Sequence, residues 1–142
     1  MRHCRSGFTL IEVLIVVVIM AVLAATIIPQ FSSSTSDAKR SALDFNTHSL
    51  RAQIELYKID HNGAVPPLNA TTHELEGLTQ AAGGFGPYII GDFPKNPFAG
   101  DASQGDWVVE GTGAGAVGTT AGWQYNSTTG EFWPNNPEYW AE

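Results

Sequence analysis

Residues 7–28 read GFTLIEVLIVVVIMAVLAATII, and within the apolar run from Phe8 to Ile28 the only charged residue is Glu12. The run holds 21 residues, which is long enough to cross a bilayer as a helix that rises about 1.5 Å per residue. A charged side chain at the bilayer centre costs about 2.5 to 3.5 kcal/mol on insertion scales. The sequence therefore predicts a transmembrane helix in which Glu12 has a function that offsets this cost.

Two simpler interpretations of the run are a cleaved secretory signal and a plain single-pass anchor. Arg2 and Arg5 precede the run, and such positive charges hold an N-terminus on the cytoplasmic side. The apolar region of a secretory signal holds roughly 7 to 15 residues, fewer than this run. An acid in a discarded signal would also weaken insertion and serve no later purpose. We therefore favour a retained segment.

Composition also argues against nucleic-acid binding and against chemistry that needs cysteine. Acidic residues outnumber basic residues 14 to 7, and beyond position 7 the basic residues are Lys39, Arg40, Arg51, Lys58 and Lys95. This set forms no basic stripe of the kind that binds nucleic acid. The single cysteine, Cys4, precedes Gly7. A cut after Gly7 would therefore leave no thiol for a disulfide, a zinc site or a nucleophile.

Residues 7–17 resemble the class III signal of type IV pilins and type II secretion pseudopilins, and Pro29 stands where the N-terminal helices of that family carry a proline. The resemblance is close over residues 5–62 and looser beyond them. It implies that a prepilin peptidase cuts the chain after Gly7 and methylates Phe8, the new N-terminal residue. It also implies an α+β fold, in which a long N-terminal helix packs on a small C-terminal antiparallel sheet.

The chemistry of Phe8 and Glu12 suits this processing. A cut after Gly7 creates an α-amine on Phe8, and an ordinary pKa of about 7.7 to 8.0 keeps most of that amine charged near neutral pH. Glu12 lies four residues further on, so both residues share one face of a helix. Packed copies could set the Glu12 carboxylate of one beside the Phe8 amine of the next. We expect this pair to fix the register between subunits rather than to add much net stability.

The resemblance, together with a change in composition after Pro29, implies a leader (1–7), a transmembrane half-helix (8–29), an amphipathic half-helix (30–62) and a periplasmic β-rich domain (63–142). Pro29 lacks a backbone N–H, which predicts a bend or a break in the helix. Beyond it, apolar and small residues return with helical spacing. One stripe holds Ala38, Ala42, Phe45, Ser49, Ala52, Leu56 and Ile59, and an adjoining stripe holds Leu43, Leu50, Ile54 and Tyr57. This wide face needs a cover, which a sheet from the rest of the chain would supply.

The helix is predicted to end near Gly63, because glycine often stops a helix and the prolines at positions 66 and 67 prevent its resumption. A short helix is predicted near residues 73–82. Strand-like segments follow at 86–90, 93–98, 106–110, 122–126 and 131–133, of which the last two form a hairpin. The simplest core for this antiparallel sheet consists of Trp107, Trp123, Trp133 and Trp140.

Other patterns point to no catalytic or cofactor site. Residues 113–118, GAGAVG, match the dinucleotide-binding pattern G-x-G-x-x-G, but a strand-like segment follows where the mechanism needs a helix. We interpret these residues as a loop. The four histidines, His3, His48, His61 and His73, lack metal-type spacing, which favours surface or packing roles.

Asp101 and Asp106 are the candidate calcium ligands, because calcium prefers flexible loops that are rich in oxygen. Many major pseudopilins in the family that this chain resembles bind calcium in an acidic C-terminal loop. This chain has aromatic and Asn residues in its last twenty positions instead. We therefore expect no cofactor.

The sequence favours a structural, non-enzymatic subunit of a type II secretion pseudopilus. We expect a single-pass protein of the bacterial inner membrane with its C-terminal domain in the periplasm. Its expected partners are a prepilin peptidase, further copies of itself, other pseudopilins and the inner-membrane assembly platform. A type IV pilin for adhesion, motility or DNA uptake is the alternative within the family. The alternative outside it is a single-pass, membrane-anchored periplasmic binding module.

Overall fold

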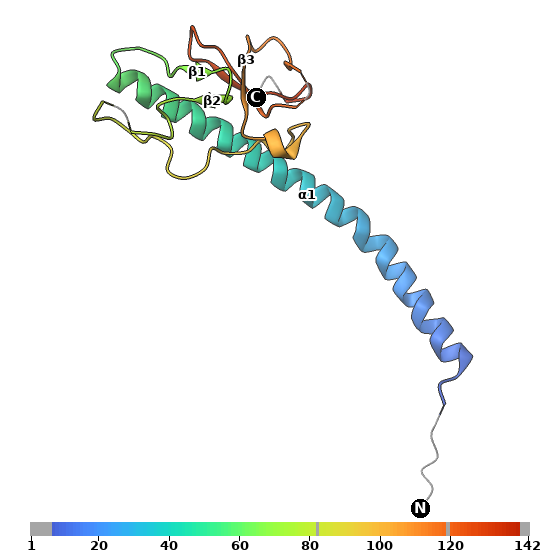
Figure 1. Cartoon of the computed structure of the whole chain (residues 1–142). Coiled ribbons are helices and arrows are strands. Elements are labelled where there is room, and N and C mark those ends of the chain that lie inside the picture. Colours follow the sequence, from blue (N-terminus) through green and yellow to red (C-terminus); the bar gives the residue numbers. More distant parts are fainter. Residues whose placement is uncertain (1–6, 82, 119, 140–142) are drawn as a thin grey trace, which may run out of the picture. The chain divides into compact units, whose positions relative to one another are not determined.

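The computed structural model describes residues 7–81, 83–118 and 120–139, and the side chains of residues 28–33 are not included in the description. The chain divides into two compact units, Met1–Ala38 and Lys39–Glu142. Helix α1, Leu10–Asp60, belongs to both units (Figure 1). The second unit also contains β1 (Leu68–Asn69), β2 (Glu74–Leu75), the 3-10 helix η1 (Ala102–Gln104), β3 (Val108–Glu110), β4 (Trp123–Tyr125) and β5 (Phe132–Pro134).

Helix α1 remains helical through Pro29 and ends at Asp60. The break that Pro29 could have caused is therefore absent from the backbone. At the other end, the N–H of Gly63 donates to the carbonyl of Lys58 at 2.7 Å, and Asn62 has a φ of 56°. Asn62 thus takes the left-handed position that closes the helix, directly before the predicted stop at Gly63.

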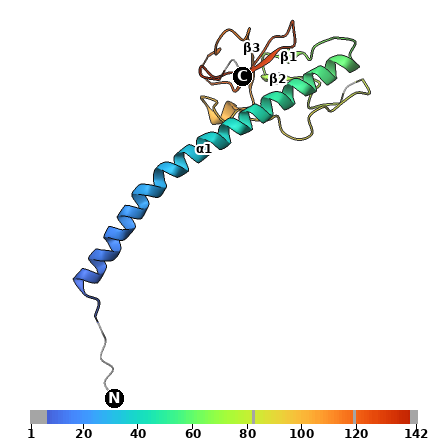
Figure 2. The ribbon, with the colours of Figure 1, turned by 180° about the vertical axis from the view of Figure 1, so that it is seen from behind.

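In the second unit α1 buries one of its two predicted stripes, the one with Leu43, Leu50, Ile54 and Tyr57. These side chains join a core with Leu75, Leu78, Val108, Trp123, Tyr125 and Phe132. The other stripe stays on the surface, where Phe45 is 73% and Ile59 is 75% exposed. The predicted cover exists, but the prediction that it spans both stripes is wrong. Figures 1 and 2 show the strands along one side of the green end of α1.

The main sheet has the order β3-β4-β5. Strands β4 and β5 are antiparallel, with Tyr125 opposite Phe132, which confirms the predicted hairpin. Strand β3 is parallel to β4, with Val108 opposite Trp123, so the prediction of an antiparallel sheet is wrong for this pair. A parallel pair needs a crossover of about a dozen residues or more, and residues 111–122 form it. The α+β fold class is confirmed.

The prediction of a short helix near residues 73–82 is wrong. Strand β2 lies in this segment and pairs with β1, with Leu75 opposite Leu68. His73 and Gly77 have φ angles of 59° and 85°, and residues with positive φ interrupt a right-handed helix. The strands predicted over 86–90 and 93–98 are also absent.

Candidate functional site

The predicted processing site is uncovered in the first unit. Among the described residues, no heavy atom other than those of Gly7 and its chain neighbours lies within 4 Å of the position that a Cβ on Gly7 would occupy, and Phe8 is 83% exposed. Because glycine has no side chain, a protease can approach its backbone closely. The described residues after Gly7 therefore leave its backbone uncovered.

Glu12 and Thr9 cap the first turn of α1. The backbone N–H and the hydroxyl of Thr9 donate to Oε2 of Glu12 at 2.8 Å and 2.7 Å. In return, the N–H of Glu12 approaches the Thr9 hydroxyl oxygen at 3.4 Å. This reciprocal arrangement is a capping box, which satisfies N–H groups that the helix itself cannot pair. The carboxylate is therefore held at the N-terminal end of the helix.

The contribution of Thr9 was missing from the sequence prediction. The signal was present, because Thr followed three residues later by Glu, just before an apolar run, is the pattern of a capping box. Sequence reasoning treated Glu12 only as an acid in an apolar environment and looked for a partner in another copy. The structure adds a partner within the chain.

The apolar segment follows directly from this cap. Leu10–Ile27 has a mean hydropathy of 3.0, and none of it is buried within the protein. Among the described residues it is the one helix segment that is long and apolar enough to span a membrane. Its Thr26 hydroxyl donates to the Val22 carbonyl at 2.8 Å, so this polar group is satisfied within the helix. Pro29 follows in α1, and its side chain lies outside the description.

The two candidate calcium ligands have different partners. Oδ1 of Asp101 accepts hydrogen bonds from the N–H and the hydroxyl of Ser103 at 2.8 Å and 2.6 Å, which lower the pKa of Asp101. Asp106 instead lies 4.0 Å from the ammonium of Lys95. Across the described residues, no group of three or more His, Asp, Glu or Cys side chains is arranged to hold a metal. Calcium binding by Asp101 and Asp106 stays a prediction.

The aromatic residues mostly pack within the second unit. Trp123 is fully buried and donates from its indole to the Pro94 carbonyl at 2.8 Å. His61 stacks on Tyr57 at 3.9 Å between ring centroids, and His73 stacks on Trp107 at 4.4 Å. Surface or packing roles were predicted for both histidines, and the ring contacts are those of packing. Two of the named residues, His3 and Trp140, lie outside the described ranges.

The glycine-rich segment 113–118 belongs to the crossover between β3 and β4. It contains no helix, so it lacks the helix N-terminus that a dinucleotide site needs. A Cβ at Gly113 would lie 2.5 Å from the Trp133 indole. Glycine is therefore needed here to let the loop pass close to the sheet, and this agrees with the interpretation as a loop.

The N-terminal segment matches a known family. Residues 2–28 match the family described as "Prokaryotic N-terminal methylation motif". This match covers the capping box and the apolar segment described above.

Curated relatives extend the similarity beyond this segment. The chain is 39% identical over 79 residues to "Type II secretion system core protein G" of Pseudomonas aeruginosa, covering 56% of this chain and 53% of the relative. It is 26% identical over 104 residues to the protein of the same name from Klebsiella pneumoniae, covering 68% and 71%. It is 32% identical over 73 residues to "ComG operon protein 3 homolog" of Bacillus licheniformis, covering 51% and 73%.

These similarities are partial. The chain spans about half the length, or less, of the first relatives that it matches. No solved structure matches the chain significantly.

Proposed function

Because the chain belongs to the family of type IV pilins and type II secretion pseudopilins, we propose that it is a structural subunit of a type II secretion pseudopilus. The observation that carries this proposal is the exposed apolar segment Leu10–Ile27 with Glu12 in its first turn. Relatives named "Type II secretion system core protein G" support secretion as the process. We also propose that the subunit has no catalytic activity and needs no cofactor.

Processing would come first. The apolar segment holds the precursor in the inner membrane, with the second unit in the periplasm. A prepilin peptidase cuts after Gly7 and methylates Phe8, and the uncovered backbone at Gly7 supports this step. The cut converts the amide nitrogen of Phe8, which is uncharged in the precursor, into a cationic N-terminal amine.

Assembly would follow through Glu12. Both hydrogen bonds from Thr9 use Oε2 of Glu12, and a carboxylate has acceptor sites on both oxygens. Oε1 is therefore the atom that would accept the Phe8 amine of the next subunit. Thr9 acts as a positioning residue, because it holds the carboxylate at the helix end where that amine arrives.

Other copies, other pseudopilins and the inner-membrane assembly platform would complete the fibre. The bundle of apolar helices would form its core, and Pro29 would loosen the helix locally, since it removes one backbone hydrogen bond. Pro29 thus lets the apolar half of the helix adjust to its neighbours during assembly.

A type IV pilus subunit is the second candidate. It is favoured by the relative from Halalkalibacterium halodurans named "Competence protein ComGC", which is 29% identical over 72 residues. The two candidates share processing and assembly and differ in the machine that uses the fibre.

Co-expression with a prepilin peptidase tests the shared step. We expect the intact mass to fall by residues 1–7 and to rise by one methyl group, with Phe8 as the new N-terminus. A catalytically inactive peptidase and the Gly7→Val variant are the controls, and both should leave the precursor whole. A chain that stays uncut beside an active peptidase would contradict both filament functions and favour a membrane-anchored binding module.

Complementation separates the two filament functions. In a type II secretion strain that lacks its major pseudopilin, this chain should restore export of the native cargo. Restoration of a type IV pilus, with no restoration of export, would favour the second candidate.

A further inference from the structure

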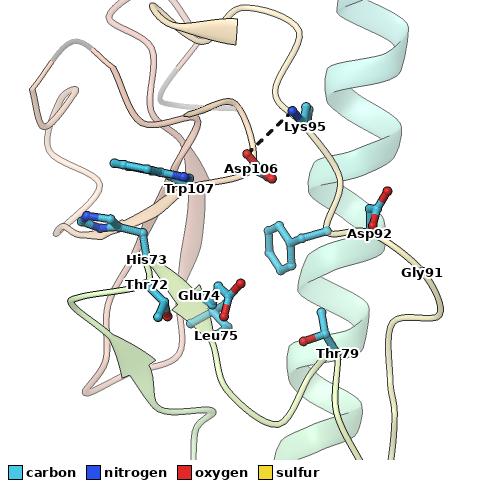
Figure 3. Close-up of a pocket in the computed structure, with 11 residues that line it drawn as sticks. Thr72, His73, Glu74, Leu75, Thr79, Gly91, Asp92, Lys95, Asp106 and Trp107 are labelled. Atoms are coloured by element: carbon cyan, nitrogen blue, oxygen red, sulfur yellow. Dashed lines mark ion pairs between the residues drawn. The ribbon is translucent and has the colours of Figure 1, made fainter. Parts of the chain in front are cut away.

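The second unit contains a cavity of about 460 Å³ that the proposed function does not use. Its lining comes from β2 and the two residues before it, from Thr79, from the loop at residues 91–95 and from the two residues before β3. Figure 3 shows the carboxylates of Glu74 and Asp106 facing this space from different sides. Residues from 72 to 107 thus converge on one site.

The lining is rich in hydrogen-bond acceptors. Glu74, Asp92 and Asp106 contribute carboxylates, and Lys95 contributes the one ammonium. The three carboxylates and the one ammonium together carry a net charge of −2. Carboxylates only accept hydrogen bonds when ionised. The cavity therefore suits a ligand that carries positive charge and mainly donates.

One acceptor lacks a donor. Oδ1 of Asp106 is buried and has no hydrogen-bond partner among the described residues. The Lys95 ammonium lies 4.0 Å away, which is too far for a hydrogen bond. A buried carboxylate oxygen without a donor costs free energy. A bound donor at this point would remove that cost.

Aromatic surface adjoins these acceptors. The rings of His73 and Trp107 stack at 4.4 Å with an interplanar angle of 16°, and both residues line the cavity together with Phe93. Figure 3 shows the stacked pair along one side. The stack holds the indole in a fixed plane. Flat aromatic surface beside carboxylates favours a planar cation, which can lie against rings while its edges donate.

We propose that this cavity binds the guanidinium of an arginine side chain carried by a partner protein. A guanidinium has five N–H donors and no acceptor, which matches an acceptor-rich lining. Its plane suits the aromatic wall better than the compact ammonium of lysine does. Asp106, whose side chain is 35% exposed, is the central acceptor, and the more exposed Glu74 and Asp92 add negative charge to the lining. A metal ion fits less well, because the described carboxylates form no group of metal-binding geometry.

The test is an NMR titration of the full chain in detergent micelles, followed at the indole N–H signals. N-acetyl-arginine-N-methylamide is the probe, and the Trp107→Phe variant identifies the Trp107 signal. The matching citrulline compound is the neutral control and the lysine compound is the ammonium control. We expect the arginine probe to shift the Trp107 signal with a dissociation constant on the order of millimolar, with weaker binding of lysine and none of citrulline.

A matched pair of variants locates the binding. Asp106→Asn should weaken binding of the arginine probe by roughly tenfold or more, because it removes a charged acceptor. Asp101→Asn removes the same charge five residues away, from a carboxylate that already pairs with Ser103. It should leave binding within about twofold of the original.

Several results would overturn the proposal. Equal binding of the citrulline and arginine compounds would show that charge plays no part. Binding of free L-arginine without binding of the blocked compound would indicate a small-molecule site rather than a partner protein. Equal losses in Asp101→Asn and Asp106→Asn, or no response of Trp107 to any probe, would also contradict it. None of these results depends on pseudopilus assembly.

Discussion

The two units of the chain treat the apolar residues of α1 in opposite ways. In the first unit, none of Leu10–Ile27 is buried by the protein. In the second unit, Leu43 and Leu50 are 0% and 1% exposed, because the strands and loops of the same chain cover them. One helix therefore serves two surroundings. The second unit carries its own cover, whereas the first needs lipid or other subunits to shield its side chains.

The same contrast between buried and exposed apolar residues exists between the two stripes of α1 in the second unit. Its buried stripe includes Leu50, while Phe45 is 73% exposed on the other stripe. A large apolar side chain on α1 is therefore not in itself evidence of a contact within the chain. Substitutions on the two stripes should separate packing within the chain from surface that is available to other copies.

The largest effect is expected for Leu50→Ala. Loss of this buried side chain should lower the free energy of unfolding of the second unit by about 2 to 5 kcal/mol, because it leaves a cavity in the core. Phe45→Ala is the matched control and should change it by less than about 0.5 kcal/mol. Thermal unfolding followed by near-ultraviolet circular dichroism measures both. Equal effects of the two variants would contradict the division of the helix into a covered and an open stripe.

A smaller effect is expected from the polar groups that hold the cover in place. The Asn96 amide donates to the Gly122 carbonyl at 2.7 Å, and its oxygen accepts from the Phe98 N–H at 2.8 Å. Asn96→Ala leaves these buried partners unpaired and should cost about 1 to 3 kcal/mol of unfolding free energy.

Asn46→Ala is the control for this prediction. Asn46 donates a single longer bond, 3.2 Å to the Lys95 carbonyl, in an exposed place. Its loss should cost less than about 1 kcal/mol. A larger loss for Asn46→Ala than for Asn96→Ala in the same unfolding measurement would show that the buried amide is not what holds these loops together.

The second unit should also lose stability at alkaline pH. Burial, followed by the hydrogen bond to Asp60, raises the pKa of Tyr88 from 10.0 to about 12. Because the folded state holds this proton more tightly, its contribution is complete below pH 10 and is lost as the pH rises towards 12. Burial also raises the pKa of Tyr125.

The variant Tyr88→Phe shows how much of this loss of stability at alkaline pH comes from Tyr88. The melting temperature of the variant should fall less steeply than that of the unmodified chain between about pH 10 and 12. Identical slopes across that range would rule out Tyr88 as a source of the alkaline loss.

The smallest effect is expected at the surface of α1. Lys58 and Glu55 form an ion pair at 2.7 Å, and the Glu55 side chain is 65% exposed. Glu55→Gln should therefore cost less than about 1 kcal/mol of unfolding free energy, and added salt should shrink the difference. A cost as large as that of Leu50→Ala would show that charge rather than apolar burial holds α1 in the second unit.

Local patterns in the sequence were enough to predict part of the fold. The apolar run after Phe8, the helix end before Gly63 and the hairpin of β4 and β5 all depend on neighbouring residues. The parallel pairing of β3 depends on where a crossover of a dozen residues returns, which no local pattern encodes. His73 shows the same limit, because its positive φ of 59° is incompatible with the right-handed helix that was predicted to begin there.

The candidate site divides in the same way. Glu12 could be found from the sequence because a single acid in an apolar run is rare and costly. Its cap by Thr9 was equally local but depended on reading the turn as a capping box. The acceptor-rich cavity could not be found, since Glu74, Asp92 and Asp106 come together only after loops and β2 have packed.

We propose that a neighbouring copy completes the first unit through Glu12. The most direct measurement is the amount of sheared fibre from cells that express the chain with a prepilin peptidase and an assembly platform. Glu12→Ala should be inserted in the membrane at least as well as the unmodified chain, yet its fibre yield should fall by roughly tenfold or more. Thr9→Ala keeps the carboxylate and the backbone N–H that donates to it but loses the hydroxyl bond, so it should lower the yield much less than Glu12→Ala does. Normal incorporation of Glu12→Ala into fibres would contradict the claim.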